Sequence, residues 1–335
     1  MNQRWLELRD GTRLATPLTM PVYQPKGSLV PMERWVPEYG VQALILNAFF
    51  LYKDRAVRER FEGGLRLKDH IGFHGCVMTD SGAFQGLKRP LHLDNRTIVA
   101  FQDRIGADVI SPLDLIPPPW DNRAQAEAKL EATLKRIRQA APLARNAILA
   151  GVQQGGRFRD LRQRATDALM EIGAKYLAIG SLVPFFNQGH DLRFVREVIG
   201  DARRQAGPDI PMHIYGAGDP VELPFMAAMG ADIFDSSAWG HYAQGGWYMT
   251  PFGALNELAP LATGPWRCTC PECAVGPDAV LPDTAALAAH NLHVVTTTLA
   301  EIRAAKAGGT LDVMLATVLE VHGRWFPASA LRWEG

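Results

Sequence analysis

Residues 76–85 read CVMTDSGAFQ, a short apolar run that ends in an aspartate followed by small residues. The apolar residues are continuous rather than alternating, which is typical of a parallel β-strand covered on both faces. Asp80 stands where such a strand would end. Seven further runs of this kind are found at residues 16–22, 41–47, 107–112, 147–153, 176–180, 212–216 and 231–235.

Helix-like segments separate several of these runs. The clearest spans residues 121–140, where Asp121 follows three prolines as the expected N-cap and apolar residues recur at helical spacing. Other helices are expected over residues 158–172, 191–206 and 220–229. Strands and helices that alternate about eight times predict an α/β fold, a (β/α)8 TIM barrel. A doubly wound open sheet is the alternative.

Composition and charge restrict the class of protein. The chain has 335 residues, of which 47% are hydrophobic and 21% charged, as in globular proteins. Its first ten residues carry charge, and no run of 18 apolar residues follows, so we expect a cytoplasmic protein without membrane contact. Basic and acidic residues number 35 each, so a polyanion would need a local patch, for which residues 53–68 and 157–164 are candidates.

In a TIM barrel the active site lies at the carboxyl ends of the strands. Three carboxylates are expected there, from Asp80, Asp114 and Asp235. A pair of carboxylates can serve as nucleophile and as general acid, for example in glycosyl transfer with retention of configuration. The alternative for each aspartate is a structural role as a cap of a turn or helix.

Other residues at these strand ends suit a flat, hydrogen-bonding ligand. Gln154 and Ser181 stand beside glycines that allow backbone N–H groups to approach a heterocycle, and Phe84 and Tyr215 offer rings to stack on its faces. Packing in the core is the alternative for each ring.

Three cysteines fall within six residues, as Cys268-x-Cys270-x2-Cys273, and His290 follows after sixteen residues. Three thiolates and one imidazole complete a tetrahedral shell, so the spacing predicts a structural zinc site. His293 competes with His290 as the fourth ligand. Cys76 lies inside a strand and is expected to be a small core residue.

Taken together, the motifs MTDSGAFQ, GVQQGG, IFDSSAW, CTCPEC and AAHNLHV resemble those of the guanine transglycosylase family, the queuine and archaeosine tRNA-ribosyltransferases. The resemblance covers almost the whole chain and is greatest to the catalytic unit of the archaeosine type. It implies a zinc-bearing barrel that exchanges guanine in a nucleic acid for a 7-deazaguanine base. The implied organisation is a barrel catalytic domain over residues 1–255, a zinc-binding subdomain over 256–300, and a helical segment over 301–335 that completes the barrel.

The resemblance also implies residue roles. Asp235 would be the nucleophile that takes the ribose C1′, and Asp80 would be the general acid and base. Substrate-binding roles would fall to Asn47, Ser81, Phe84, Asp114, Gln154, Gly180, Ser181 and Tyr215. The metal ligands would be Cys268, Cys270, Cys273 and His290, and no redox cofactor is implied.

Two features depart from the family pattern: Ala83 replaces a second glycine after Gly82, and residues 236–239, SSAW, replace the proline-threonine-arginine motif of bacterial members. The expected partners are tRNA first and DNA second, a base such as 7-cyano-7-deazaguanine, and a second copy in a homodimer. The alternatives are a transglycosylase for a free nucleoside or nucleotide and a non-catalytic partner subunit.

Overall fold

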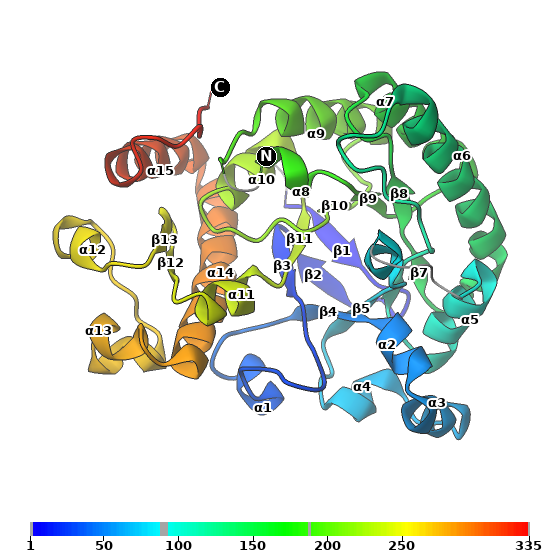
Figure 1. Ribbon diagram of the computed structural model, residues 1–335, viewed down its shortest axis with the longest axis horizontal. Helices are drawn as coiled ribbons and strands as arrows, with labels where there is room; N and C mark the ends of the chain where they lie inside the picture. Colours follow the sequence, from blue (N-terminus) through cyan, green and yellow to red (C-terminus); the bar gives the residue numbers. More distant parts are fainter. Residues whose placement is uncertain (1–2, 88–92, 187–188, 334–335) are drawn as a thin grey trace.

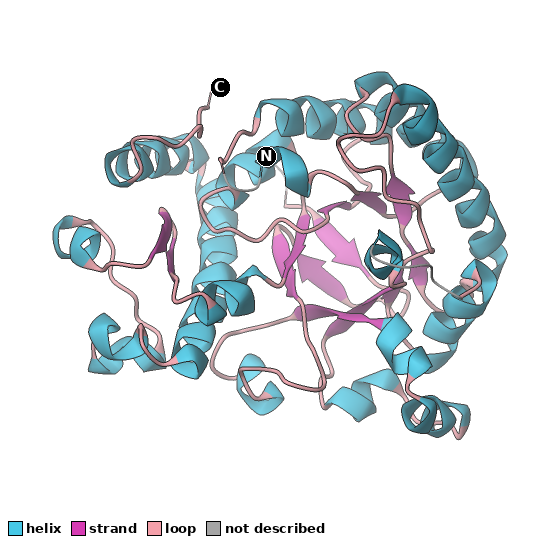
Figure 2. Cartoon of the chain, in the orientation of Figure 1, coloured by secondary structure: helices cyan, strands magenta, loops and turns pink. Residues whose placement is uncertain are grey.

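The computed structural model describes residues 3–87, 93–186 and 189–333. A ring of parallel strands occupies the centre of the molecule, and helices surround it (Figures 1 and 2). The strands of the ring are β3 (Leu18–Pro21), β4 (Ala43–Asn47), β5 (Cys76–Asp80), β6 (Val109–Ile110), β7 (Ile148–Leu149), β8 (Gly151–Gln153), β9 (Leu177–Ile179), β10 (Met212–Ile214) and β11 (Ile233–Ser236). Each of the eight apolar runs overlaps one of these strands or, for residues 147–153, two, and only β11 extends beyond its run, by one residue.

The ring is closed at two joints. Strands β4-β5-β6-β7 pair in that order, and β3-β11-β10-β9-β8 pair as a second series, all in parallel. Val22, just beyond β3, bridges to Ile45 of β4 in parallel, and only Ala150 separates β7 from β8. The chain is therefore a (β/α)8 barrel, as predicted. Its strands are almost entirely buried, which explains their continuous apolar sequences.

An antiparallel hairpin, β1 (Trp5–Glu7) and β2 (Arg13–Ala15), covers the amino ends of the barrel strands. Leu6, Leu8 and Leu14 of this hairpin are buried in the main core cluster. Arg9 donates to the carbonyl oxygen of Ala147, directly before β7, which fixes the hairpin at this end. The hairpin does not cover the opposite end of the barrel, where the carboxyl ends of the strands lie.

Helices lie between successive strands (Figure 1). Their bounds are α1 (Met32–Trp35), α2 (Ala48–Lys53), α3 (Arg55–Glu62), α4 (Leu67–Ile71), α5 (Asn95–Ile105), α6 (Arg123–Ala140), α7 (Arg159–Ile172), α8 (Val183–Phe186), α9 (Arg193–Ala206) and α10 (Leu223–Met229), with 3-10 turns η1 (Ala83–Leu87) and η2 (Ala141–Leu143). Among the described residues, no helix has both the length and the apolar character that crossing a bilayer requires.

The expected N-cap of the longest of these ten helices, α6, was wrong by one residue. Asn122, not Asp121, caps α6: its side chain accepts from the Gln125 backbone N–H, and the Gln125 side chain accepts from the Asn122 N–H. This reciprocal pair satisfies two otherwise unpaired donors, which a lone aspartate one position earlier does not. Asp121 instead accepts a 2.7 Å hydrogen bond from Lys129 Nζ.

After β11 the chain forms an extension beside the barrel, on the left of Figure 1. It contains α11 (Ala238–Gln244), the hairpin β12 (Tyr248–Thr250) and β13 (Gly253–Leu255), α12 (Ala259–Thr263), η3 (Pro271–Val275) and α13 (Pro277–Val280). The long helix α14 (Thr284–Gly308) then packs against both this extension and barrel strand β3, and α15 (Leu311–Trp325) packs on α10 and α14.

Candidate active site

A cavity of about 1350 Å³ opens at the carboxyl ends of the barrel strands, and Asp80, Asp114 and Asp235 all line it. The other predicted substrate-binding residues on its wall are Asn47, Phe84, Gln154, Gly180, Ser181 and Tyr215. Ser81 is fully buried and is not part of the described cavity wall. Residues from seven of the strand ends thus meet at one cavity.

Asp80, the last residue of β5, is the most strongly perturbed of the three carboxyls. Burial raises the pKa of Asp80 to about 7, with a further contribution from the nearby Asp114 carboxylate. Asn47, the last residue of the neighbouring strand β4, donates from Nδ2 to Asp80 Oδ2 at 2.9 Å. The orientation of Asp80 is therefore fixed, and its carboxyl group can both hold and release a proton near neutral pH.

A chain of hydrogen bonds links the ends of β6, β8 and β9. Gln154 donates from Nε2 to Asp114 Oδ2 at 2.6 Å, and Ser181 Oγ donates to Gln154 Oε1 at 2.7 Å. Burial raises the pKa of Asp114 to about 6, although the Gln154 hydrogen bond opposes this. A Cβ on Gly180 would approach Gln154 Nε2 to 2.5 Å, so a larger residue at this position would displace the Gln154 amide.

Arg162 of α7 holds the backbone next to this chain of hydrogen bonds. Its guanidinium group is buried and donates to the carbonyl oxygens of Gly156, Gly180 and Ser181 at 2.7–3.2 Å. Ser181 has a positive φ of 58°, a conformation that a non-glycine residue adopts only when its surroundings hold it. Burial lowers the pKa of Arg162 to about 9. The sequence signalled this residue only as a member of the basic stretch 157–164.

Ion pairs within the protein neutralise part of each basic stretch. In the stretch 157–164, Arg159 pairs with Asp201 and Arg164 pairs with Glu127 and Glu131, in addition to the buried Arg162. In the stretch 53–68, the ion pairs are Arg55 with Glu59, Arg58 with Glu62 and Lys68 with Asp108. These pairs neutralise part of the positive charge that the two stretches could present to phosphates.

Asp235, in β11, is held from the neighbouring strand β10. The backbone N–H of Gly216 donates to Asp235 Oδ1 at 3.1 Å, and His213 Nε2 lies 2.9 Å from the same oxygen. The other ring nitrogen of this fully buried histidine, Nδ1, lies 2.8 Å from the hydroxyl oxygen of Tyr176. Sequence reasoning missed His213, because a histidine inside an apolar strand gives no signal that distinguishes it from a core residue.

The tyrosine predicted to stack on a ligand is also anchored. Tyr215 lies beside the His213 ring, at a centroid distance of 4.8 Å, and its hydroxyl group is 2.9 Å from Ser111 Oγ. Burial raises the pKa of Tyr215 well above its usual value, so its hydroxyl stays protonated. The Tyr215 ring can therefore present a fixed neutral surface to the cavity.

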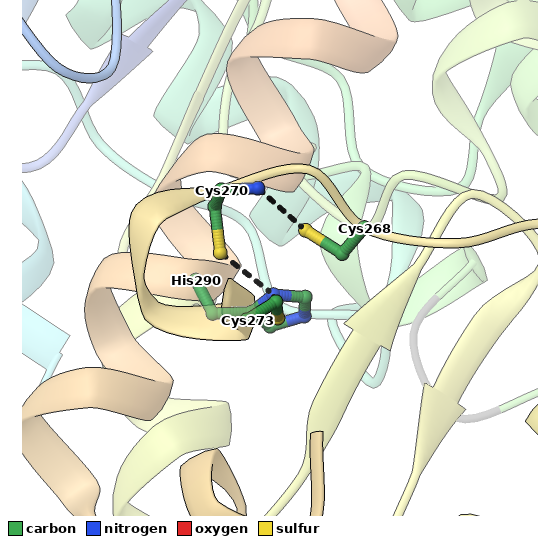
Figure 3. Close-up of side chains that lie close together, drawn as sticks. All are labelled: Cys268, Cys270, Cys273 and His290. Carbon is green, nitrogen blue, oxygen red and sulfur yellow. Dashed lines mark hydrogen bonds between the residues drawn. The ribbon is translucent and has the colours of Figure 1, made fainter. Parts of the chain in front are cut away.

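The cysteine-rich segment and α14 bring together a second group of residues, Cys268, Cys270, Cys273 and His290 (Figure 3). Their ligand atoms all lie within 4.8 Å of one another, and Cys270 Sγ and Cys273 Sγ are 3.6 and 3.3 Å from His290 Nδ1. A tetrahedral zinc ion with ordinary bond lengths separates its ligands by about 3.3–3.8 Å. The group could therefore hold a metal ion, and His290 rather than His293 belongs to it.

The imidazole of His290 is oriented for this role. Its Nε2 lies 2.9 Å from the carbonyl oxygen of Met249, and its ring stacks on Tyr248 at 3.7 Å between centroids. Because the carbonyl can only accept, Nε2 carries the hydrogen and Nδ1 is left with its lone pair toward the three sulfur atoms. This is the tautomer that a metal ligand needs.

Comparison with known proteins agrees with this geometry. The model of the family described as queuine tRNA-ribosyltransferase matches residues 4–324. The chain is 36% identical over 324 residues to the tRNA-guanine(15) transglycosylase of Methanopyrus kandleri. This match covers 94% of this chain and 69% of that protein. Enzymes of the same name from Pyrococcus abyssi and Haloarcula marismortui are 33% and 34% identical over 95% and 89% of this chain.

The chain spans only 55% and 61% of the length of the Pyrococcus and Haloarcula relatives. The match to the family nevertheless extends from the first hairpin to the last helix and includes the cavity residues and the cysteine-rich segment. This chain belongs to the queuine tRNA-ribosyltransferase family, a family of pentosyltransferases.

Proposed function

We propose that this protein exchanges a guanine base in tRNA for a 7-deazaguanine base through a covalent aspartyl-ribosyl intermediate. The observation that carries the proposal is the meeting of Asp80 and Asp235 in one cavity with groups that can bind a purine edge. The names of the relatives, tRNA-guanine(15) transglycosylases, make tRNA the first polymer to test and position 15 the first position.

In the first half of the reaction, an oxygen of the Asp235 carboxylate attacks the ribose C1′. The C1′–N9 bond breaks, and its electron pair leaves with guanine, which takes a proton from Asp80. A carboxyl group with a pKa of about 7 suits this transfer, because it holds its proton in about half of the molecules at neutral pH. The Gly216 N–H, which donates to Oδ1, keeps the Asp235 carboxylate in place for attack, and His213 Nε2 lies close to the same oxygen.

In the second half, the incoming base loses its N9 proton to Asp80, and N9 attacks C1′ from the face that guanine left. The C1′–oxygen bond breaks and the Asp235 carboxylate is regenerated. Two displacements retain the configuration at C1′. Asp80 regains from the incoming base the proton that it gave to guanine. No redox cofactor is needed.

We propose that the other residues of the cavity wall recognise the base. Asp114 and Gln154 would accept and donate hydrogen bonds along the purine edge, with Ser181 and the backbone at Gly180 beside them. Tyr215 and Phe84 would contact the ring faces. Asp114 is suited to a guanine-like edge because its raised pKa, about 6, still leaves most of it ionised at neutral pH, as an acceptor for N–H groups.

The metal is proposed to be zinc in a structural role. Three thiolates and one imidazole fill four positions, so no open position remains for substrate. A bound zinc ion would join the cysteine-rich segment to α14 through His290. A homodimer is proposed on the family resemblance alone.

Exchange of isotope-labelled guanine tests the function. Purified protein is incubated with separate pools of tRNA, duplex DNA and guanosine nucleotides, and label in each pool is counted. We expect label in tRNA, chased out by 7-cyano-7-deazaguanine. The Asp235→Asn variant should lose at least about 1000-fold in rate while its melting temperature stays unchanged, since the carboxylate supplies the nucleophile.

Other outcomes of the same experiment would contradict the proposal. Label that enters only DNA or only nucleotides would assign a different substrate. Exchange at the normal rate by Asp235→Asn would refute the nucleophile, and absence of label from every pool would refute the activity.

A further inference from the structure

Three large aromatic side chains stand exposed at the mouth of the cavity. Phe84, Trp120 and Trp247 are 57%, 81% and 39% exposed, and all three line the same cavity as the carboxylates. They come from the segments that follow β5, β6 and β11. Because β6 and β11 stand opposite each other in the closed ring, the segments that carry the two tryptophans leave the barrel on opposite sides.

The most exposed of these rings is held by a rigid turn. The Asp121 backbone N–H donates to the Pro118 carbonyl oxygen at 3.1 Å, and the Asp121 side chain is anchored by Lys129. Pro117, directly before this turn, lies close to Gly156, since a Cβ added to that glycine would stand 3.4 Å from the Pro117 Cβ. Trp120 is therefore presented to solvent by a fixed backbone, which lowers the entropy lost when a ligand stacks on it.

Among the described residues, no ring contact or cation–π contact involves Phe84, Trp120 or Trp247. The Trp120 ring is the most exposed of the three, and the Trp247 ring is partly packed against its own segment. By contrast, the exposed Trp5 on the hairpin at the other end of the barrel lies under the guanidinium group of Arg13, at 4.8 Å. Large apolar side chains left open around a cavity are typical of a binding surface.

We propose that Trp120 and Trp247, beside Phe84, form an aromatic rim on which the bases next to the exchanged guanosine stack. The inference rests on the proposed function, because a base held inside the cavity remains attached to neighbouring nucleotides that must cross its mouth. Each neighbouring base has a flat face whatever its identity, so the rim binds without reading sequence.

The charge of the chain favours a contact that does not depend on phosphates alone. The chain has no net charge, and Arg58, Lys68, Arg159 and Arg164 of the two basic stretches are ion-paired within the protein. These pairs reduce the electrostatic attraction to the RNA backbone. Stacking on neutral rings supplies affinity that does not depend on positive charge.

The test compares tRNA with and without the flanking bases. Once labelled guanine has located the exchanged position, fluorescently labelled tRNA is assembled from synthetic halves, either intact or with abasic riboses on both sides of that guanosine. Dissociation constants are measured for wild type, Trp120→Ala, Trp247→Ala and the matched control Trp5→Ala. Melting temperatures are measured alongside, and we expect them to be unchanged, because exposed rings contribute little to folding.

We expect Trp120→Ala and Trp247→Ala each to weaken binding of intact tRNA about tenfold, in the range known for base–aromatic stacking. Binding of the abasic tRNA should change less than about twofold, and Trp5→Ala should behave as wild type. Trp120→Phe should restore most of the affinity, because a ring is kept.

Two results would overturn the rim while leaving the proposed function standing. In the first, wild type exchanges guanine but Trp120→Ala and Trp247→Ala bind intact tRNA as well as Trp5→Ala does. In the second, the variants weaken binding of intact and abasic tRNA equally, which would assign these rings to some contact other than flanking bases. Failure of wild type to exchange guanine would instead refute the proposed function.

Discussion

Burial decides how the carboxyl groups of the cavity behave. Asp80 lies in a low-dielectric environment with Asp114 and Asp235 nearby, so its charged form is disfavoured, and two backbone N–H groups only partly compensate. The folded protein therefore keeps the Asp80 proton up to a pH of about 7, whereas the unfolded chain releases it near pH 4. The residue that suits proton transfer is also a source of instability.

This difference predicts a pH dependence of stability. Between pH 4 and 7 the folded state binds more protons than the unfolded state, so the free energy of unfolding falls as pH rises through this window. Asp80→Asn cannot ionise and avoids this loss, and its new side chain still offers an oxygen to Asn47. We expect Asp80→Asn to be more stable than wild type by about 2–4 kcal/mol at pH 8 and equal to it at pH 4. Urea unfolding at a series of pH values measures this.

The control for this measurement is Asp10, an exposed aspartate whose pKa is lowered by the backbone N–H of Thr12. Asp10→Asn should change stability in the opposite direction, with a loss above pH 4. Parallel pH profiles for wild type and Asp80→Asn would contradict the assigned environment of Asp80.

At the scale of elements, α14 connects two parts of the molecule. Its residue His290 belongs to the metal-binding group, and the same helix packs on barrel strand β3 and on α11. The extension between β11 and α14 consists of short helices and one two-stranded hairpin, which bury little apolar surface on their own. A metal ion that joined the cysteines to α14 would therefore hold this extension in place.

Removal of one sulfur ligand tests this connection. Cys270→Ser should lose the metal, measured by atomic absorption, and should make the extension sensitive to limited proteolysis, while the barrel keeps its circular dichroism spectrum. Cys76→Ser is the matched control, because Cys76 is buried in barrel strand β5, and this variant should keep its metal even if its melting temperature falls. A full metal content in Cys270→Ser would refute the site.

At the scale of the whole molecule, a buried ion-pair network closes the barrel at its amino end. Asp232, directly before β11, accepts from Arg4 Nε at 2.5 Å and from Arg203 Nη2 at 2.5 Å, and also from the Met212 backbone N–H at 3.0 Å. These partners come from the residue directly before the N-terminal hairpin, from α9 and from β10. One carboxylate thus joins segments more than 200 residues apart in the sequence.

Loss of this carboxylate should be costly. Asp232→Ala leaves two guanidinium groups partly buried without their counter-charge, and we expect the free energy of unfolding to fall by about 3–5 kcal/mol. Glu59→Ala removes the exposed pair with Arg55 and should cost less than about 0.5 kcal/mol. Denaturant unfolding of both variants measures the difference, and equal losses would contradict a special role for Asp232.

The barrel and the residues at its mouth could be predicted from the order of residues alone. Continuous apolar runs can be buried only between two covered faces, and their alternation with helices left few other arrangements. Since parallel strands end at the same edge, the positions of Asp80, Asp114 and Asp235 along the chain are enough to assign them to one site. The spacing of Cys268, Cys270 and Cys273 likewise indicated a metal site.

The contacts that support these residues became visible only in the folded molecule. The fold placed His290 rather than His293 with the cysteines, the buried His213 beside Asp235, Arg162 behind the Gly180–Ser181 turn, and the exposed Trp120 at the mouth. Each of these assignments depends on contacts between segments far apart in the chain. Local patterns of hydrophobicity and spacing carry no information about such contacts, because burial and pairing are set by the packing of the whole barrel.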